Sequence, residues 1–255
     1  MPYKEMLRFA SNCGYSEAAL AGANVGSCRC PAAEPLWQRN VLVSQFMQAA
    51  EDPGITPLQI HTLRRILDLL IPVPIPPEQR SFLLPSPSSC QASLLSFGRD
   101  VAQYWNSPSG VHKEDAEALV AELAYACSVN PPQVELLRMD PSLRGQYIVE
   151  RQTLRVNSAN PASIGVPNLV HEFAHHAQLQ YSLTHPGIQA DMITVHLKLA
   201  EAGRRLRKEG NSALGQPMYA LSFTEQDANL WKQDLLQPLA QQMGWSLTTV
   251  PISEI

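Results

Sequence analysis

The 255-residue sequence lacks any apolar run close to the roughly 18 residues that a membrane-spanning helix needs. Its first residues also lack the apolar core of a secretory signal peptide. We therefore expect no membrane association and a cytoplasmic location. Export by a route that needs no signal peptide is compatible with the same absences.

An excess of positive charge is also missing. The chain has 19 Lys and Arg against 23 Asp and Glu, which gives a formal net charge of −4 and a pI near 6.0. Nucleic-acid binding as the main activity is not expected, because it needs a basic surface. Two helices expected over 37–50 and 56–70, the second with Thr56 as N-cap and Pro57 at its first position, could form a DNA-reading helix-turn-helix. Only Arg64 and Arg65 in the second helix are basic, so a packing role is favoured.

Cysteine pairs at regular spacing are absent. The odd set of five cysteines favours free thiols, and none has a marked environment that would single it out as a nucleophile. Three of them lie near one another in sequence, but no nearby His completes the four ligands of a structural zinc site. The five are Cys13, Cys28, Cys30, Cys90 and Cys127.

The most informative stretch that is present contains His-Glu-x-x-His, formed by His171, Glu172 and His175. Residues four apart share a helix face, so the two imidazoles can bind one metal ion, for which Zn²⁺ is well suited. Glu172 then lies beside the metal, where it can take a proton from water. A solvated amphipathic helix would also explain these residues. The apolar neighbours of the motif, and Pro167 expected in the first helical turn, favour a helix packed inside a domain.

A catalytic zinc site needs a third protein ligand, and the segment 224–231 supplies the best candidate. Thr224 and Asp227 have the spacing of a capping box, which predicts Glu225 in the first turn of a new helix. Asn229 shares a face with Glu225 and could hydrogen-bond a ligating His. Asp227 is expected to cap the helix, but it would replace Glu225 as ligand if the helix began later.

His-Glu-x-x-His followed by Glu-x-x-Ala-Asn at 225–229 resembles the gluzincin metallopeptidases, most of all the ImmA/IrrE family of regulatory proteases. The resemblance covers roughly the C-terminal half. It implies that His171, His175 and Glu225 are zinc ligands and that Glu172 is the general base. The long interval between His175 and Glu225 leaves another gluzincin branch open. The segment 171–178 is also similar to bacterial zincins with His-Glu-x-x-His-x-x-Gln, some of them attached to secretion or toxin systems.

The resulting fold prediction is α+β. Residues 1–89 are expected to form a helical N-terminal region that ends in a proline-rich linker, and residues 90–255 a zincin-like metallopeptidase domain. Within that domain we predict helices over 92–105, 113–128 and 188–209 and a hairpin over 146–156. The resemblance to the ImmA/IrrE family implies a short strand over 134–138 before the hairpin. An edge strand of this hairpin would accept an extended peptide by strand addition, although a hairpin that only covers the core fits equally well.

The expected function is zinc-dependent hydrolysis of a peptide bond in a protein or peptide substrate, with Glu172 as base and then as acid. Tyr219, Tyr181 and His185 are candidates to stabilise the oxyanion, and His176 is expected to be structural or to support the ligands. Two alternatives stay open: a catalytically silent zincin that binds a regulatory partner, and a toxin or effector protease with the same chemistry. The sequence does not predict the oligomeric state.

Overall fold

The computed structural model describes residues 90–140, 143–185, 188–210 and 222–247, together with isolated positions before residue 64 and residues 215 and 219. These residues form a mixed α+β fold with five helices and a three-stranded sheet. The predicted α+β class is therefore confirmed. Within these ranges, no helix combines the length and the apolar character needed to cross a membrane.

The chain divides into two compact units. One comprises Met1–Ile75, His185–Gln226 and Ile252–Ile255, and the other comprises Pro76–Thr184 and Asp227–Pro251. The division after Ile75 falls in the proline-rich segment, and the division after Gln226 falls within the continuous helix α11 (Phe223–Met243). The domain boundary expected at residue 89 stays a prediction.

The sheet has the order β1-β3-β2 and consists of β1 (Gln133–Leu137), β2 (Gly145–Ile148) and β3 (Thr153–Asn157). β3 pairs parallel to β1 and antiparallel to β2. The predicted hairpin is thus confirmed. It turns through a 3-10 segment, Val149–Arg151, and closes with Gln152 in the left-handed region at φ 48°.

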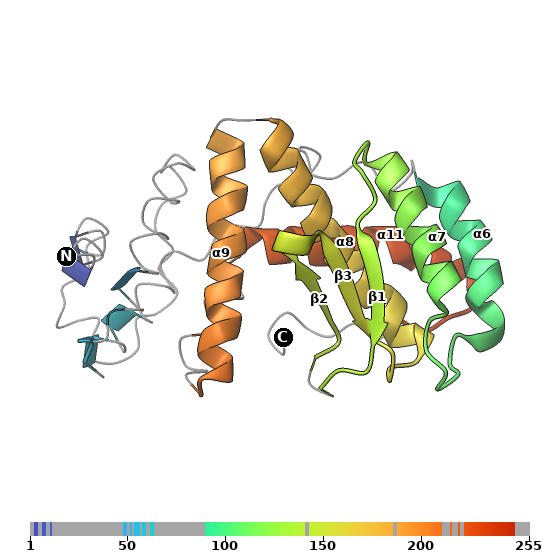
Figure 1. Cartoon of the computed structure of the whole chain (residues 1–255), viewed down its shortest axis with the longest axis horizontal. Coiled ribbons are helices and arrows are strands. Elements are labelled where there is room, and N and C mark those ends of the chain that lie inside the picture. Colours follow the sequence, from blue (N-terminus) through green and yellow to red (C-terminus); the bar gives the residue numbers. More distant parts are fainter. Residues whose placement is uncertain are drawn as a thin grey trace. The chain divides into compact units, whose positions relative to one another are not determined.

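Two helices cover the sheet. α8 (Ala162–Thr184) packs across β2 and β3, while α7 (Lys113–Ala126) packs beside α8 and against β1 (Figure 1). α6 (Gln91–Val101) packs on α7 and continues into a 3-10 turn, Ala102–Tyr104. The apolar side chains at helical spacing on α7 are buried: Ala116, Leu119, Val120, Leu123 and Ala124.

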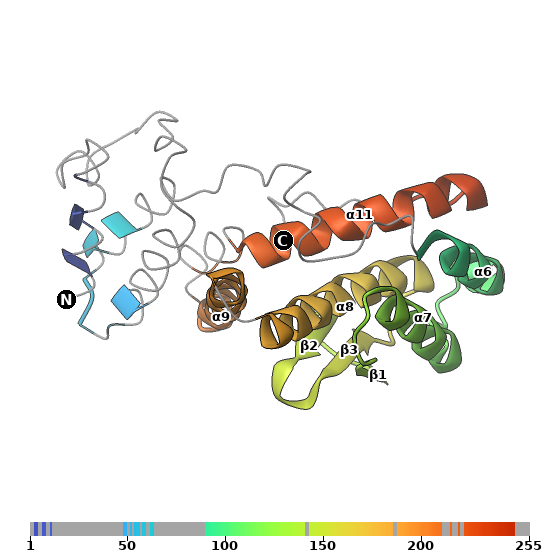
Figure 2. The ribbon, with the colours of Figure 1, turned by 90° about the horizontal axis from the view of Figure 1, so that it is seen from above.

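α11 runs along the side of α8 that faces away from the sheet (Figure 2). The Phe173 ring of α8 packs on Trp231 with ring centroids 6.2 Å apart. Beyond the C-terminal end of α11, Trp245 stacks on Trp105, which follows the 3-10 turn after α6; their ring centroids are 3.9 Å apart and their interplanar angle is 7°. α8 is therefore enclosed between the sheet and α11, which explains why its central residues are buried on all sides.

Two predicted helix starts are wrong. α8 begins at Ala162, so Pro167 lies inside the helix and not in its first turn. The reason is that the N–H groups of Ile164 and Gly165 both bond to the Pro161 carbonyl (2.9 Å), which starts the helix earlier. α11 begins at Phe223, so Thr224 lies within the first turn and is not its N-cap.

The long helix predicted over 188–209 is confirmed as α9 (Ile188–Lys208), which ends before Gly210 at φ 84°. The helices expected over 37–50 and 56–70 lie mostly outside the described residues, as do the proline-rich segment, Cys13, Cys28 and Cys30. Thr56 is confirmed as an N-cap. The Gln59 N–H donates to Thr56 Oγ1 (3.3 Å), and the Thr56 N–H donates to Gln59 Oε1 (2.8 Å).

Candidate metal centre

The two histidines of the motif lie one turn apart on α8. Their Nε2 atoms are 3.1 Å apart and their ring planes are nearly perpendicular, at 89°. Two imidazole nitrogens bound to one tetrahedral zinc at about 2.0–2.1 Å would lie about 3.3 Å apart. His171 and His175 therefore already have the spacing that a shared metal ion requires.

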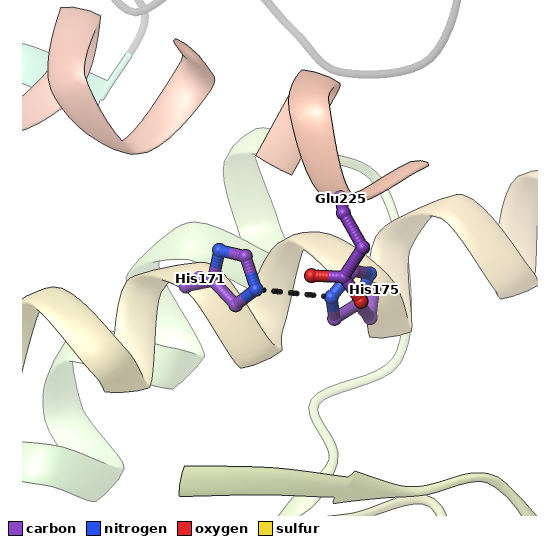
Figure 3. Close-up of side chains that lie close together, drawn as sticks. All are labelled: His171, His175 and Glu225. Carbon is purple, nitrogen blue, oxygen red and sulfur yellow. Dashed lines mark hydrogen bonds between the residues drawn. The ribbon is translucent and has the colours of Figure 1, made fainter. Parts of the chain in front are cut away.

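Glu225 completes the group from the first turn of α11. The ligand atoms of His171, His175 and Glu225 all lie within 4.8 Å of one another, and the carboxylate points toward the imidazoles (Figure 3). All three residues are buried; Glu225 is only 2% exposed. Among the residues that the structure describes, these three form the one group of His, Cys, Asp or Glu side chains whose ligand atoms lie close enough together to hold a metal ion.

The donor set fits a metal ion. Two imidazoles and a carboxylate are the ligands of one well-known class of catalytic zinc site, and they also suit other divalent transition metals. A carboxylate buried this deeply is unfavourable unless a cation or hydrogen-bond donors compensate its charge. The His171, His175 and Glu225 group could therefore hold a metal ion, although the donor set alone does not select zinc.

One residue of α9 and one residue of the segment before α11 contact the Glu225 carboxylate. The Tyr219 hydroxyl donates to Glu225 Oε2, and Arg204 Nη2 lies 3.7 Å from Oε1. Arg204 and Arg207 also lie over the Tyr219 ring, at 5.8 and 4.8 Å from its centroid. These contacts orient the carboxylate. Nothing in the sequence pattern indicated Arg204, and the oxyanion role expected of Tyr219 stays a prediction.

Glu172 follows His171 in the sequence, is 7% exposed, and is not one of the three side chains whose ligand atoms converge. Its Oε2 is buried and has no hydrogen-bond partner among the described residues. The start of β2 passes directly against it: a Cβ on Gly145 would lie 3.1 Å from Glu172 Cγ. The absence of a side chain at Gly145 therefore brings a strand backbone up to the predicted general base.

His175 is hydrogen-bonded on the side opposite the ligand group. Its Nδ1 lies 3.1 Å from Gln178 Oε1, and Gln178 Nε2 donates to Asp227 Oδ2 (3.0 Å). Asn229, which the sequence suggested for a supporting contact of this kind, accepts a hydrogen bond at Oδ1 from Lys232 Nζ (2.8 Å), and its predicted bond to a ligating His stays a prediction. Asp227, expected as a capping residue or substitute ligand, contacts Gln178. The clue to Gln178 was its position three residues after His175, on the same face of α8.

His176 faces away from the ligand group. Its Nε2 lies 2.8 Å from the Asn130 carbonyl, so this nitrogen donates, and Nδ1 accepts from the Tyr147 hydroxyl at 3.0 Å. Burial lowers the pKa of His176 and raises the pKa of Tyr147 to about 12. Both groups are thus neutral partners that attach α8 to β2 and to the loop before β1, which agrees with the structural role expected of His176.

Comparison of the chain with protein-family models, with curated proteins and with solved structures gives no significant match. The gluzincin resemblance therefore depends on the two sequence motifs, at 171–175 and 225–229, and on the buried group of His171, His175 and Glu225 to which both motifs contribute.

Proposed function

We propose that this protein is a zinc-dependent metallopeptidase of the gluzincin type that hydrolyses a peptide bond in a protein or peptide substrate. The observation that carries the proposal is the buried convergence of His171, His175 and Glu225, with Glu172 next to it in sequence. The buried Glu172 Oε2, which has no hydrogen-bond partner among the described residues, supports a proton-accepting role, which a site that only stored metal would not need.

A zinc ion at this site would supply a water molecule of pKa about 7 and would polarise the substrate carbonyl. Glu172 takes a proton from the attacking water while the water oxygen bonds to the substrate carbonyl carbon. Glu172 then gives that proton to the amide nitrogen as the C–N bond breaks, so the products are a carboxylic acid and an amine. Tyr219 and Arg204 keep the Glu225 carboxylate oriented throughout.

An extended polypeptide fits the surroundings of Glu172 best. β2 is an edge strand of the described sheet, and Gly145 places its first residue against Glu172. A substrate that added to this edge as a further strand would run past the general base with its backbone exposed to attack. A toxin or effector protease would use the same residues and would differ in its target.

Elemental analysis of protein purified without a tag tests the proposal. We expect about one zinc per chain in the wild type and none in Glu225→Gln. Asp234→Asn is the matched control, because Asp234 is an exposed acid on the same helix. A wild-type protein that takes up no zinc even after incubation with the metal would overturn the proposal and leave a zincin-shaped binding protein.

A further inference from the structure

We infer that Gln178 and Asp227 act together as positioning residues that fix the ring tautomer of His175, so that its Nε2 presents a lone pair to the metal. The inference rests on the proposed metal site and deepens it. Two hydrogen bonds in series carry it: His175 Nδ1 to Gln178 Oε1 at 3.1 Å, and Gln178 Nε2 to Asp227 Oδ2 at 3.0 Å.

The chemistry of the three groups gives this series one direction. A carboxylate only accepts, so Asp227 must receive a hydrogen from the NH₂ end of the Gln178 amide. The other end of the amide is then its carbonyl oxygen, which also only accepts. The hydrogen between Gln178 and His175 must therefore come from Nδ1, and in a neutral imidazole this leaves Nε2 without a hydrogen.

Burial of the three side chains fixes the donor–acceptor direction of these two hydrogen bonds. Gln178 is 0% exposed, His175 2% and Asp227 3%. Water cannot replace a partner there, so turning the amide over would place two acceptors, or two donors, face to face in a buried setting. The tautomer needed for metal binding is thus the one that the surrounding protein stabilises before any metal arrives.

The arrangement also assigns a second task to α11. Glu225 and Asp227 lie two residues apart at its start, the first in the ligand group and the second behind His175 through Gln178. α11 therefore supplies one proposed ligand, Glu225, and orients another, His175, through Asp227 and Gln178. A supporting residue of this kind typically contributes about 10-fold to 100-fold to metal affinity.

The test uses full-length Gln178→Leu, the double variant Gln178→Glu with Asp227→Asn, and Gln241→Leu as a control on the exposed face of α11. The double variant exchanges the carboxylate and the amide. The carboxylate at position 178 can accept from His175 Nδ1 and from the amide at position 227, so the direction of the series is kept. Two quantities are measured: the ¹⁵N chemical shifts of the His175 ring in metal-free protein, and the zinc dissociation constant by competition with a chelator.

We expect the Nδ1–H tautomer in the wild type, the double variant and the control. Gln178→Leu should show a mixture of tautomers and a zinc affinity weaker by about 10-fold to 100-fold. An Nε2–H tautomer in the wild type would overturn the inference, and so would a folded Gln178→Leu protein with unchanged tautomer and affinity.

The tautomer is read without metal, so a failure of the zinc-peptidase proposal would be seen separately, as absent zinc uptake with the Nδ1–H tautomer intact. If Gln178→Leu does not fold, the wild-type tautomer and rescue in the double variant still decide.

Discussion

Glu172 is the single residue on which the proposed hydrolysis depends most directly. It contributes no ligand atom to the His171, His175 and Glu225 group, but it follows His171 directly in the sequence and its side chain is buried. The proposed function therefore assigns metal binding and proton transfer to different side chains, and substitution can separate them.

Glu172→Gln should bind zinc as the wild type does and should lose at least about 100-fold in the rate of peptide hydrolysis, because the amide cannot take the proton of water. Zinc content and the cleavage of fluorescently quenched casein measure the two effects. Glu201→Gln, an exposed change on α9, is the control. Cleavage by Glu172→Gln at the wild-type rate would contradict the assignment.

Tyr219 acts on the metal site through Glu225. Tyr219→Phe removes the hydroxyl that donates to Oε2 and should weaken zinc binding about 10-fold, since residues that orient a ligand typically contribute 10-fold to 100-fold. Chelator competition measures the change. Tyr125→Phe is the matched control, because the Tyr125 side chain is 85% exposed. Equal affinities in the two variants would show that the hydroxyl does not orient the ligand.

Among the elements, the connection from β1 to β2 determines where Gly145 meets Glu172. Asn157, at the end of β3, holds this connection. Its Oδ1 accepts from the N–H groups of Met139 (3.2 Å) and Ala159 (3.1 Å), and its Nδ2 donates to the carbonyls of Asp140 (3.2 Å) and Leu143 (2.9 Å). One buried side chain thus pairs with backbone groups of Met139, Asp140 and Leu143 in this connection.

Asn157→Ala should lower the free energy of unfolding by about 3 kcal/mol, because it leaves several buried backbone groups unsatisfied at about 1–3 kcal/mol each, partly relieved by water. Chemical denaturation measures it. The same change at Asn106, an exposed turn residue, should cost less than about 0.5 kcal/mol. Similar losses at both positions would indicate that the Asn157 bonds do not hold the connection.

For the whole molecule, a metal ion bound by His171, His175 and Glu225 would link metal binding to folding. Its ligands come from α8 and from the start of α11, where Glu225 lies 54 residues after His171 along the chain, and unfolding separates them. A metal that binds only the folded chain stabilises it by mass action.

Zinc at about 100 times its dissociation constant should stabilise the folded state by about 2.7 kcal/mol. For a chain of this size that corresponds to a rise of about 5–10 °C in Tm. Thermal unfolding followed by circular dichroism, with and without zinc, measures the shift. Glu225→Gln should show no comparable rise, and an equal rise in both proteins would place the bound zinc elsewhere.

The sequence by itself determined the features that depend on neighbours along the chain. Helical spacing placed His171 and His175 on one face, and the local pattern around Glu225 placed it in the first turn of α11, as the structure confirms. The α+β class, the hairpin and α9 were predicted for the same reason, since periodicity and turn chemistry act over a few residues. The zinc-peptidase activity stays a proposal.

Only the tertiary structure decided which distant side chains meet. The bond from Gln178 to Asp227 and the contact of Arg204 with Glu225 both join segments that lie far apart in sequence. Asp227 had the spacing of a capping residue, and in the structure its Oδ2 accepts a hydrogen bond from the buried amide of Gln178 on α8. Hydrogen bonding in a buried environment, which no local pattern encodes, therefore determined how the ligands are supported.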